Sequence, residues 1–177
     1  MNKNIKSLFT DKENRVVVKQ LFWERILHCT LDSWENVWLL PHRVKCDSKC
    51  KEIQWKILHN VYPTRVSLYK LGIVETNLCL SCNSLDYIEH FFVYCSSVKP
   101  LWQVIELKAS AFYGYSIKLS DSDIMLGYNV HEAVKFKILN RIILLAKVCI
   151  SKFRWFGKHP NLVLLFEREC SYRNLTM

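Results

Sequence analysis

Glycine and proline are scarce in this sequence, with four of each among 177 residues. Their scarcity excludes collagen-like and other fibrous chains, and a hydrophobic content of 50% excludes a disordered chain. Because few residues interrupt regular structure, we expect helices rather than a sandwich of short strands. The sequence therefore predicts a mainly α protein that is long enough to bury its own core.

Long apolar runs are missing as well. The first ten residues hold no signal-peptide pattern, and the apolar stretch at residues 142–146 is much shorter than the roughly 18 residues of a membrane span. We therefore expect no membrane segment and a nuclear or cytoplasmic location rather than secretion. In such a compartment, the eight cysteines favour metal binding or buried thiols over disulfides.

Basic residues exceed acidic ones, which gives a formal net charge of +9 and a pI of about 9.2. Residues 1–78 hold 13 basic and 8 acidic groups, and residues 103–177 hold 11 and 6. Between them, residues 79–102 hold one basic group and two acidic ones. Two basic flanks therefore surround a slightly acidic middle, and such a basic chain suits a nucleic-acid partner.

Capping and stop signals divide the chain into short helices. Asp32 or Ser33 can cap a helix that ends before Pro41, and Asp47 or Ser48 can cap the next one. Thr64 is a further N-cap candidate, and Asp121 with Asp123 fits another cap better than a metal site. Besides the Pro41 helix, we predict helices at residues 16–29, 49–60, 65–71 (closed by Gly72) and 133–155.

The last predicted helix is amphipathic when its residues are placed at 100° per position. Most apolar residues fall on one half of the wheel, while Lys137, Arg141, Lys147 and Lys152 fall on the other. This pattern is typical of a helix that packs on a core and leaves a basic face in solvent. The same face would be able to contact phosphates.

Cys79, Cys82, His90 and Cys95 form the pattern C-x2-C-x7-H-x4-C. The first pair fits a tight turn, and the second pair fits a helix that Asp86 would cap. Four nitrogen and sulfur ligands with no open position are typical of a structural, tetrahedral Zn²⁺ site. The alternatives are four unrelated residues or a redox C-x-x-C, and the redox motif would leave the histidine and the last cysteine unexplained. We predict a small helical domain with an embedded CCHC zinc knuckle made of a turn and a helix.

His42, Cys46 and Cys50 are spaced by four residues and form a possible second metal site. A helix that starts at Asp47 or Ser48 would break their common face, which favours the alternative of free thiols.

The middle of the chain also resembles a known family. The sequence carries, in this order, Gln54-Trp55-Lys56, Leu58-His59, Pro63-Thr64, Gly72-Ile73, the C-x2-C pair, Glu89-His90-Phe91-Phe92, Cys95 and Leu101-Trp102. This order resembles the zinc-binding domain at the C-terminus of reverse transcriptases from non-LTR (LINE-type) retrotransposons. The resemblance implies an N-terminal helical flank at 1–48, the zinc-binding domain at 49–102 and a C-terminal basic helical region at 103–177.

The resemblance implies a supporting role rather than catalysis. The polymerase requires a Tyr/Phe-x-Asp-Asp loop, and this chain has no adjacent aspartates, so we expect no enzymatic activity. In the family, this module is thought to help hold RNA or DNA near the polymerase during reverse transcription. Two alternatives remain open: a protein-interaction module that docks on the polymerase thumb, and a non-functional retroelement fragment.

Charge separates the roles of the zinc unit and its flanks. Three thiolates and one Zn²⁺ leave one net negative charge, which is a poor match for phosphate. We therefore interpret the zinc unit as a structural clip that joins the helices of residues 49–71 to those after Ser97. The candidate nucleic-acid contacts are then Lys45, Lys49, Lys51, Lys56, Arg65 and Lys70 on one side, and Lys137, Arg141, Lys147, Lys152 and Arg154 on the other.

Overall fold

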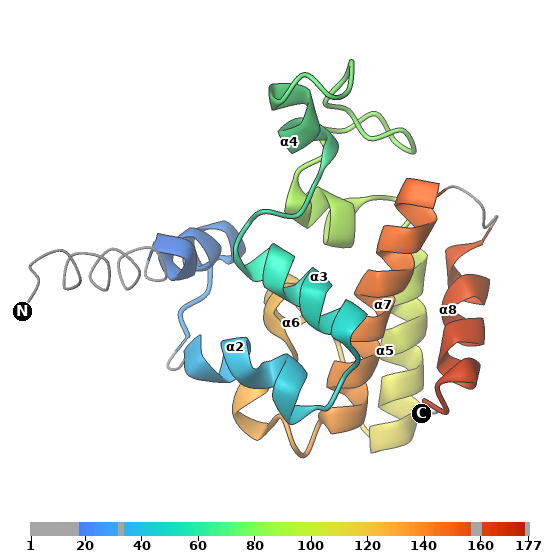
Figure 1. Cartoon of the computed structure of the whole chain (residues 1–177). Helices are drawn as coiled ribbons and strands as arrows, with labels where there is room; N and C mark the ends of the chain where they lie inside the picture. The colour runs from blue at the N-terminus through green and yellow to red at the C-terminus, as the bar shows by residue number, and fades with distance from the viewer. Residues whose placement is uncertain (1–17, 32–33, 157–160, 176–177) are drawn as a thin grey trace, which may run out of the picture.

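The computed structural model describes residues 18–31, 34–156 and 161–175, and in these ranges the chain is mainly helical, as predicted (Figure 1). The only β-pairing there is an isolated bridge between Leu78 and Leu85. A first helix covers residues 18–27. It is followed by α2 (Trp34–Arg43), α3 (Ser48–Leu58), α4 (Arg65–Lys70), the π-helix η1 (His90–Tyr94), α5 (Lys99–Tyr113), α6 (Asp121–Leu126), the 3-10 helix η2 (Val130–Glu132), α7 (Lys137–Phe156) and α8 (Leu162–Tyr172).

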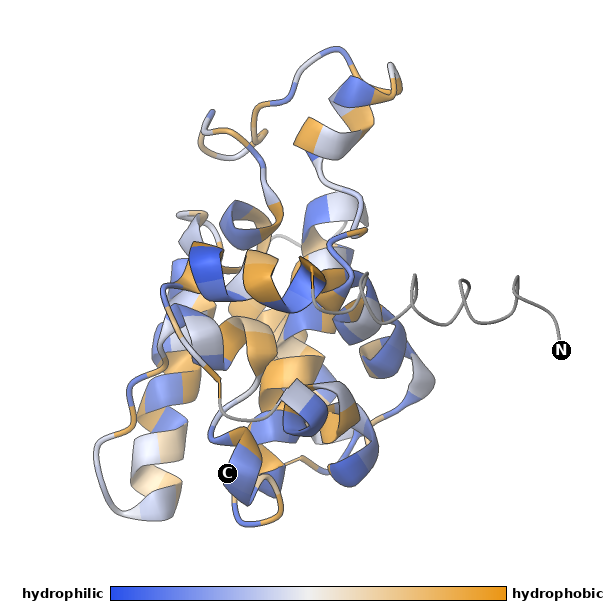
Figure 2. Cartoon of the chain, turned by 90° about the vertical axis from the view of Figure 1, so that its left-hand side faces the viewer, coloured by the Kyte–Doolittle hydropathy of each residue, from blue (hydrophilic) through white to orange (hydrophobic). Residues whose placement is uncertain are grey.

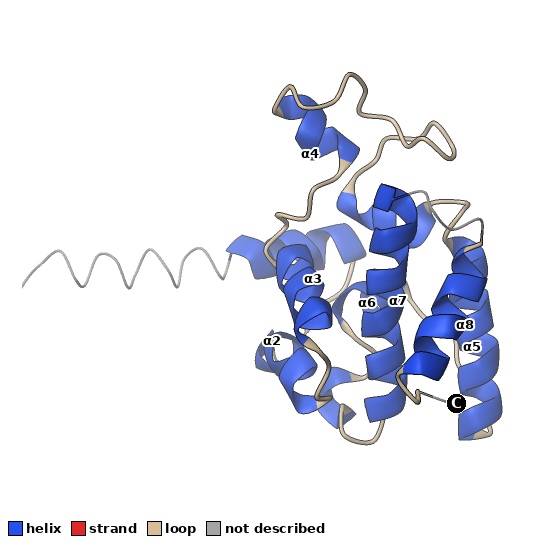
Figure 3. Ribbon diagram, turned by 45° about the vertical axis from the view of Figure 1, so that its right-hand side comes forward, coloured by secondary structure: helices blue, strands red, loops and turns tan. Residues whose placement is uncertain are grey.

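Helix α7 lies at the centre of the helical body and packs against α2, α3, α5 and α8 (Figures 1 and 3). Every residue from 142 to 150 is buried, so the predicted solvated basic face is wrong for this stretch. Leu144 and Val148, which fall on the polar half of the wheel, are covered by neighbouring helices. A helix surrounded on several sides is buried all round, and its own period does not reveal this.

The helix caps agree with the sequence in most places. Asp47 accepts a hydrogen bond from Cys50 N at 2.8 Å, Thr64 forms a capping box with Ser67, and Gly72 has a φ of 68°. Helix α6 begins with a capping box, in which the Ser120 side chain accepts from Asp123 N and the Asp123 side chain accepts from Ser120 N. Each cap uses contacts within three residues, which a sequence pattern can encode.

Some predicted helix ends differ from the structure. Helix α2 runs through Pro41 to Arg43, because Leu40 and Pro41 are buried in the core and this packing overrides the local signal. Helix α7 begins at Lys137, after the 3-10 turn η2, rather than at 133. The predicted caps Asp32 and Ser33, and the start of the first helix at residue 16, lie outside the described residues.

A projection, residues 64–87, rises from one end of the helical body (Figures 1 and 3). It contains α4 and a long loop that returns to η1 beside the C-terminal end of α7. In Figure 2, the projection alternates between hydrophilic and hydrophobic stretches. Among the described residues, the buried side chains form one cluster that extends from Trp23 to Leu175 and includes residues from the ranges 1–48, 49–102 and 103–177. Within the described residues, no helix is both long and apolar enough to cross a membrane.

Lys147 lies inside this core with 1% of its surface exposed. Its Nζ donates to Gln54 Oε1 at 2.6 Å and to the Met125 carbonyl at 3.0 Å, so α7, α3 and α6 share one polar junction. Gln54 Nε2 donates to the same carbonyl at 3.0 Å. Burial lowers the pKa of Lys147 to about 7, because the ammonium loses its water.

This pKa predicts a pH-dependent stability. Between pH 7 and the ordinary lysine pKa, the unfolded chain holds more protons on residue 147 than the folded chain, so stability rises with pH. Relative to Lys147→Met, wild type should gain about 1–2 kcal/mol between pH 7 and 8.5. Urea unfolding at fixed zinc concentration measures this difference. The variant also loses the hydrogen bond from Lys147 to Gln54, and this loss lowers its free energy of unfolding by the same amount at each pH. Parallel plots of unfolding free energy against pH for the two proteins would therefore contradict the prediction.

Candidate metal centre

A tight loop positions the first two cysteines of the C-x2-C pair. Cys79 N donates to Ser84 O at 2.8 Å, and Asn83 N donates to Cys79 O at 2.9 Å. Asn83 takes a left-handed φ of 58°, which asparagine tolerates better than most residues. The loop therefore reverses the chain and brings Cys82 back toward Cys79, as the sequence predicts for a knuckle turn.

His90 and Cys95 belong to a π-helical turn. Five residues rotate an α-helix by about 500°, which would leave these side chains roughly 140° apart. In η1, Cys95 N instead donates to His90 O at 3.0 Å, a bond that spans five residues. The wider turn brings residues five apart closer to one face, so the x4 spacing matches the π-helix better than an α-helix.

The turn and the π-helix bring all four side chains to one point. The Cys79 and Cys95 Sγ atoms are 3.7 Å apart, and those of Cys82 and Cys95 are 3.9 Å apart. Cys82 Sγ lies 3.3 Å from His90 Nε2, and all four donor atoms lie within 4.8 Å of one another. A tetrahedral Zn²⁺ with Zn–S bonds of about 2.3 Å requires sulfur atoms about 3.8 Å apart. The spacing is also far longer than the S–S bond of a disulfide.

Ligands must lose their protons to bind a metal ion, and two of the four groups are shifted toward the deprotonated form, whereas burial raises the pKa of Cys95. Burial opposes ionisation of the Cys82 thiol, but hydrogen bonds from Ser84, and then from Cys79 and Cys95, lower its pKa to about 7. Burial also lowers the pKa of His90, which favours the neutral imidazole. Thiolates with a neutral imidazole are the donor set that zinc prefers.

The comparison with protein families agrees with this geometry. A family model described as zinc-binding in reverse transcriptase matches residues 7–102, which is more than half of the chain and includes all four cluster residues. The chain belongs to this reverse-transcriptase zinc-binding family. No curated protein and no solved structure gives a significant match. A zinc-binding family and a Cys3His cluster positioned to bind a metal ion together confirm Zn²⁺ as the expected cofactor.

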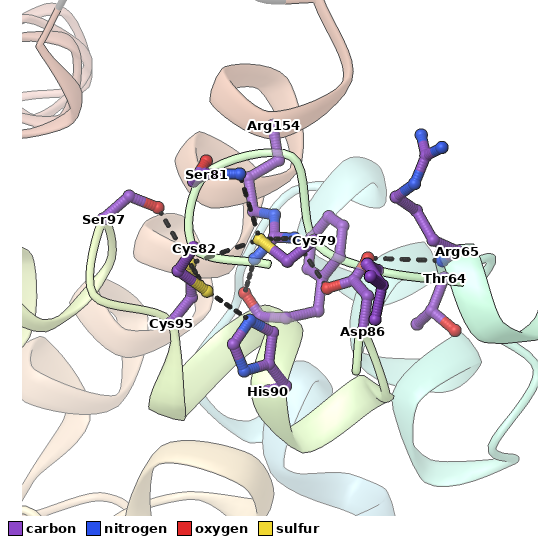
Figure 4. A network of polar contacts seen from close by, with 12 residues as sticks. Thr64, Arg65, Cys79, Ser81, Cys82, Asp86, His90, Cys95, Ser97 and Arg154 are labelled. Atoms are coloured by element: carbon purple, nitrogen blue, oxygen red, sulfur yellow. Dashed lines mark hydrogen bonds and ion pairs between the residues drawn. The ribbon is translucent and has the colours of Figure 1, made fainter. Parts of the chain in front are cut away.

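Further donors surround the sulfur atoms of the cluster (Figure 4). Ser81 N donates to Cys79 Sγ at 3.4 Å, and Ser97 Oγ lies 3.1 Å from Cys95 Sγ. Such contacts stabilise negative charge on sulfur and orient it toward a metal ion.

Arg154, near the end of α7, also donates to the cluster, although it lies far from the four ligands in the sequence. Its Nη2 donates to Cys79 Sγ at 3.2 Å and to Asp86 Oδ1 at 2.6 Å, and its guanidinium lies 4.2 Å from the centre of the Phe91 ring. The two ion-paired side chains are only 6% and 1% exposed. No spacing rule in the sequence connects Arg154 with the knuckle, because Arg154 lies 59 residues after Cys95 and outside the family match.

Asp86 has a different role from the predicted one. The Asp86 side chain accepts no hydrogen bond from the first amides of the helix that carries His90, so the prediction that Asp86 caps it is wrong. Its Oδ2 instead accepts from Arg65 N at 3.2 Å, at the start of α4. The buried carboxylate therefore bonds to the Arg154 guanidinium and to Arg65 N, because a buried charge requires such partners. Asp86 thereby connects α4, the cysteine loop and α7.

The predicted nucleic-acid residues lie in different environments. Arg154 and Lys147 are buried and bonded within the protein, so the prediction that they contact phosphate is wrong. On the surface, Lys49 and Lys56 pair with Glu52, and Lys152 pairs with Glu169. Among the described residues, no acidic partner is found for Lys45, Lys51, Arg65, Lys70, Lys137 or Arg141. Their nucleic-acid contacts stay a prediction.

His42, Cys46 and Cys50 do not form a second cluster of the same kind. In the part of the chain that the structure describes, Cys79, Cys82, His90 and Cys95 are the one group of three or more such ligands that converges. Helix α3 starts at Ser48, between the two cysteines, as expected.

Proposed function

We propose that this chain is a non-catalytic module from the C-terminal region of a LINE-type reverse transcriptase. In this proposal, Cys79, Cys82, His90 and Cys95 bind one Zn²⁺, and the module helps hold RNA or DNA during reverse transcription. The observation that carries it is the tetrahedral spacing of these donors in a chain of the reverse-transcriptase zinc-binding family.

The zinc unit acts as a clip in this proposal. Asp86 and Arg154 connect the cysteine loop with the start of α4 and the end of α7. Trp102 Nε1 in α5 also donates to Phe92 O in η1, at 2.8 Å. A metal ion at this point would therefore fix three parts of the chain that are distant in sequence. Nucleic-acid contact falls to basic side chains elsewhere, since the clip itself would carry net negative charge.

A salt series tests the nucleic-acid role. Wild type and the double variant Lys137→Glu with Arg141→Glu are compared for binding to single-stranded RNA and DNA between 50 and 200 mM salt. Affinity of wild type should fall steeply with salt, as phosphate contacts require, and the variant should bind much more weakly at low salt. Equally weak binding by both proteins would contradict the role.

One observation favours a second candidate, a protein-docking module for the polymerase region of a full-length relative. Leu71, Ile73 and Leu80 on the projection are 71%, 64% and 77% exposed. Exposed apolar side chains gathered on one segment are typical of interaction sites. Under this alternative, Ile73→Ser with Leu80→Ser abolishes association with the polymerase region. Under the first proposal, the same change leaves nucleic-acid affinity unaltered.

A further inference from the structure

A pocket of about 250 Å³ opens where the α2–α3 loop meets α7 and the end of α8. Three basic residues from these three segments line it: Lys45, Arg141 and Arg173. The other lining residues are Cys46, Asp47, Cys50, Leu145 and Leu175. The volume is below the roughly 300 Å³ of pockets that bury drug-sized ligands, so it suits a small group rather than a whole nucleotide.

The pocket lies apart from the metal centre. Arg141 and Arg154 belong to the same helix and are thirteen residues apart, which places them about 20 Å apart along the axis. Figure 1 shows the ends of α2 and α8 at the end of the body opposite the projection. A ligand in the pocket would therefore not touch the residues that surround the zinc cluster.

The acidic groups near the pocket leave positive charge uncompensated. Asp47 caps α3 through Cys50 N and pairs with Arg173, which also reaches Glu169 at 3.4 Å. Lys45 and Arg141 have no acidic partner among the described residues. Lys45 and Arg141, from different elements, thus line a cavity whose one carboxylate, that of Asp47, pairs with Arg173.

The pKa of the Cys46 thiol depends mainly on its neighbour Cys50, and the charge of Arg141 adds a smaller effect. A hydrogen bond from Cys50 lowers the pKa of Cys46, and the charges of Lys51 and then Arg141 lower it further, against the effect of burial. Thiolates are stabilised in electropositive surroundings, and so are other anions. Cys46 is half-buried among the lining residues, so it also provides a chemical probe of whether the pocket is occupied.

We propose that this pocket binds one phosphate group of a nucleic-acid backbone, held between Lys45 and Arg141, with Arg173 as a fixed third cation. The inference rests on the proposed nucleic-acid role and narrows it to one place on the surface. Arg141 supplies a planar fork suited to two phosphate oxygens, and Lys45 supplies a mobile point charge.

The test compares two variants that lose the same charge. The pocket variant is Lys45→Gln with Arg141→Gln. The control is Lys118→Gln with Lys135→Gln, whose lysines are 80% and 62% exposed and pair with Glu106 and Glu132. Binding of labelled single-stranded RNA and DNA is measured from 50 to 200 mM salt. The pocket variant should lose about tenfold in affinity, with its log–log salt slope reduced by about 1–2, and the control should stay within about twofold of wild type.

Four further measurements complete the test. Thermal unfolding and zinc content of both variants should match wild type, and Arg141→Lys should recover part of the lost affinity because it restores the charge without the fork. Oligonucleotide and inorganic pyrophosphate should each slow the alkylation of Cys46 by iodoacetamide, while Cys170 on α8 reacts at its usual rate.

The outcomes separate this inference from the broader function. If both double variants lose affinity equally, the pocket has no special role, although nucleic-acid binding stands. If wild type binds no oligonucleotide at low salt, both proposals fall. If pyrophosphate protects Cys46 but the pocket variant binds oligonucleotides like wild type, the pocket binds free pyrophosphate and the proposed contact with the nucleic-acid backbone is wrong.

Discussion

Cys95→Ser should abolish zinc retention and strongly destabilise the protein. The Cys95 Sγ lies 3.7 and 3.9 Å from the other two sulfur atoms of the cluster, and the residue is fully buried. A serine hydroxyl does not ionise at neutral pH, so the site would lose one of its anionic ligands. Structural zinc sites contribute about 10–16 kcal/mol in apparent terms. Even a loss of about 5 kcal/mol would lower the Tm by about 10–20 °C in a chain of this size.

The destabilisation should extend beyond the cysteine loop. Phe91 and Phe92 in η1 pack against Tyr62, with ring centroids 5.1 and 4.8 Å away, and Phe91 also lies 6.1 Å from Trp155. Loss of the clip would loosen these core contacts.

Metal analysis after dialysis and thermal unfolding measure both effects. Cys170→Ser is the matched control, because Cys170 is a half-buried thiol on α8 outside the cluster, and it should keep its zinc. A Cys95→Ser protein that retains zinc and melts with wild type would show that the ligand is misassigned.

Arg154→Met should weaken zinc binding by about 10–100-fold, as expected when a partner of a metal ligand is removed. Methionine fills similar space but donates no hydrogen bond to Cys79 Sγ, and the thiolate then loses the positive charge of the guanidinium beside it. The change also leaves Asp86 buried beside no cation, which costs about 3–5 kcal/mol. Competition with a chromophoric chelator measures the first effect, and chemical denaturation measures the second.

A double variant separates the two consequences. Arg154→Met with Asp86→Asn removes the unpaired charge, so most of the stability should return while zinc affinity stays low. Lys152→Met, on the same helix and paired with Glu169, should leave zinc affinity unchanged. If Arg154→Met binds zinc as tightly as wild type, Arg154 serves only to join the loop to α7.

The features that were predictable from the sequence depend on short distances along the chain. The four cluster residues lie within seventeen positions, and a turn and one helical segment bring them together. The caps at Asp47 and Thr64 use bonds to residues three positions away. Residue type and spacing determine such contacts almost completely, so the metal centre and these helix starts were accessible without a structure.

The features that were missed depend on which helices become neighbours. Lys147 and Arg154 are charged residues of the kind that occupy a solvated helix face. In the structure, however, α3 and α6 cover Lys147, and the cysteine loop covers Arg154. A helical wheel gives the direction of a side chain and does not show what lies opposite it. The pocket at Arg141 arises in the same way, because its residues come from three separate segments.

The most direct test of the proposed clip is X-ray absorption at the zinc edge on the purified 177-residue chain, combined with its zinc content. We expect one zinc per chain, with three sulfur neighbours at about 2.3 Å and one nitrogen at about 2.0–2.1 Å. Protein that is folded without zinc, or a spectrum dominated by oxygen neighbours, would contradict the assignment of Cys79, Cys82, His90 and Cys95 as a closed structural site.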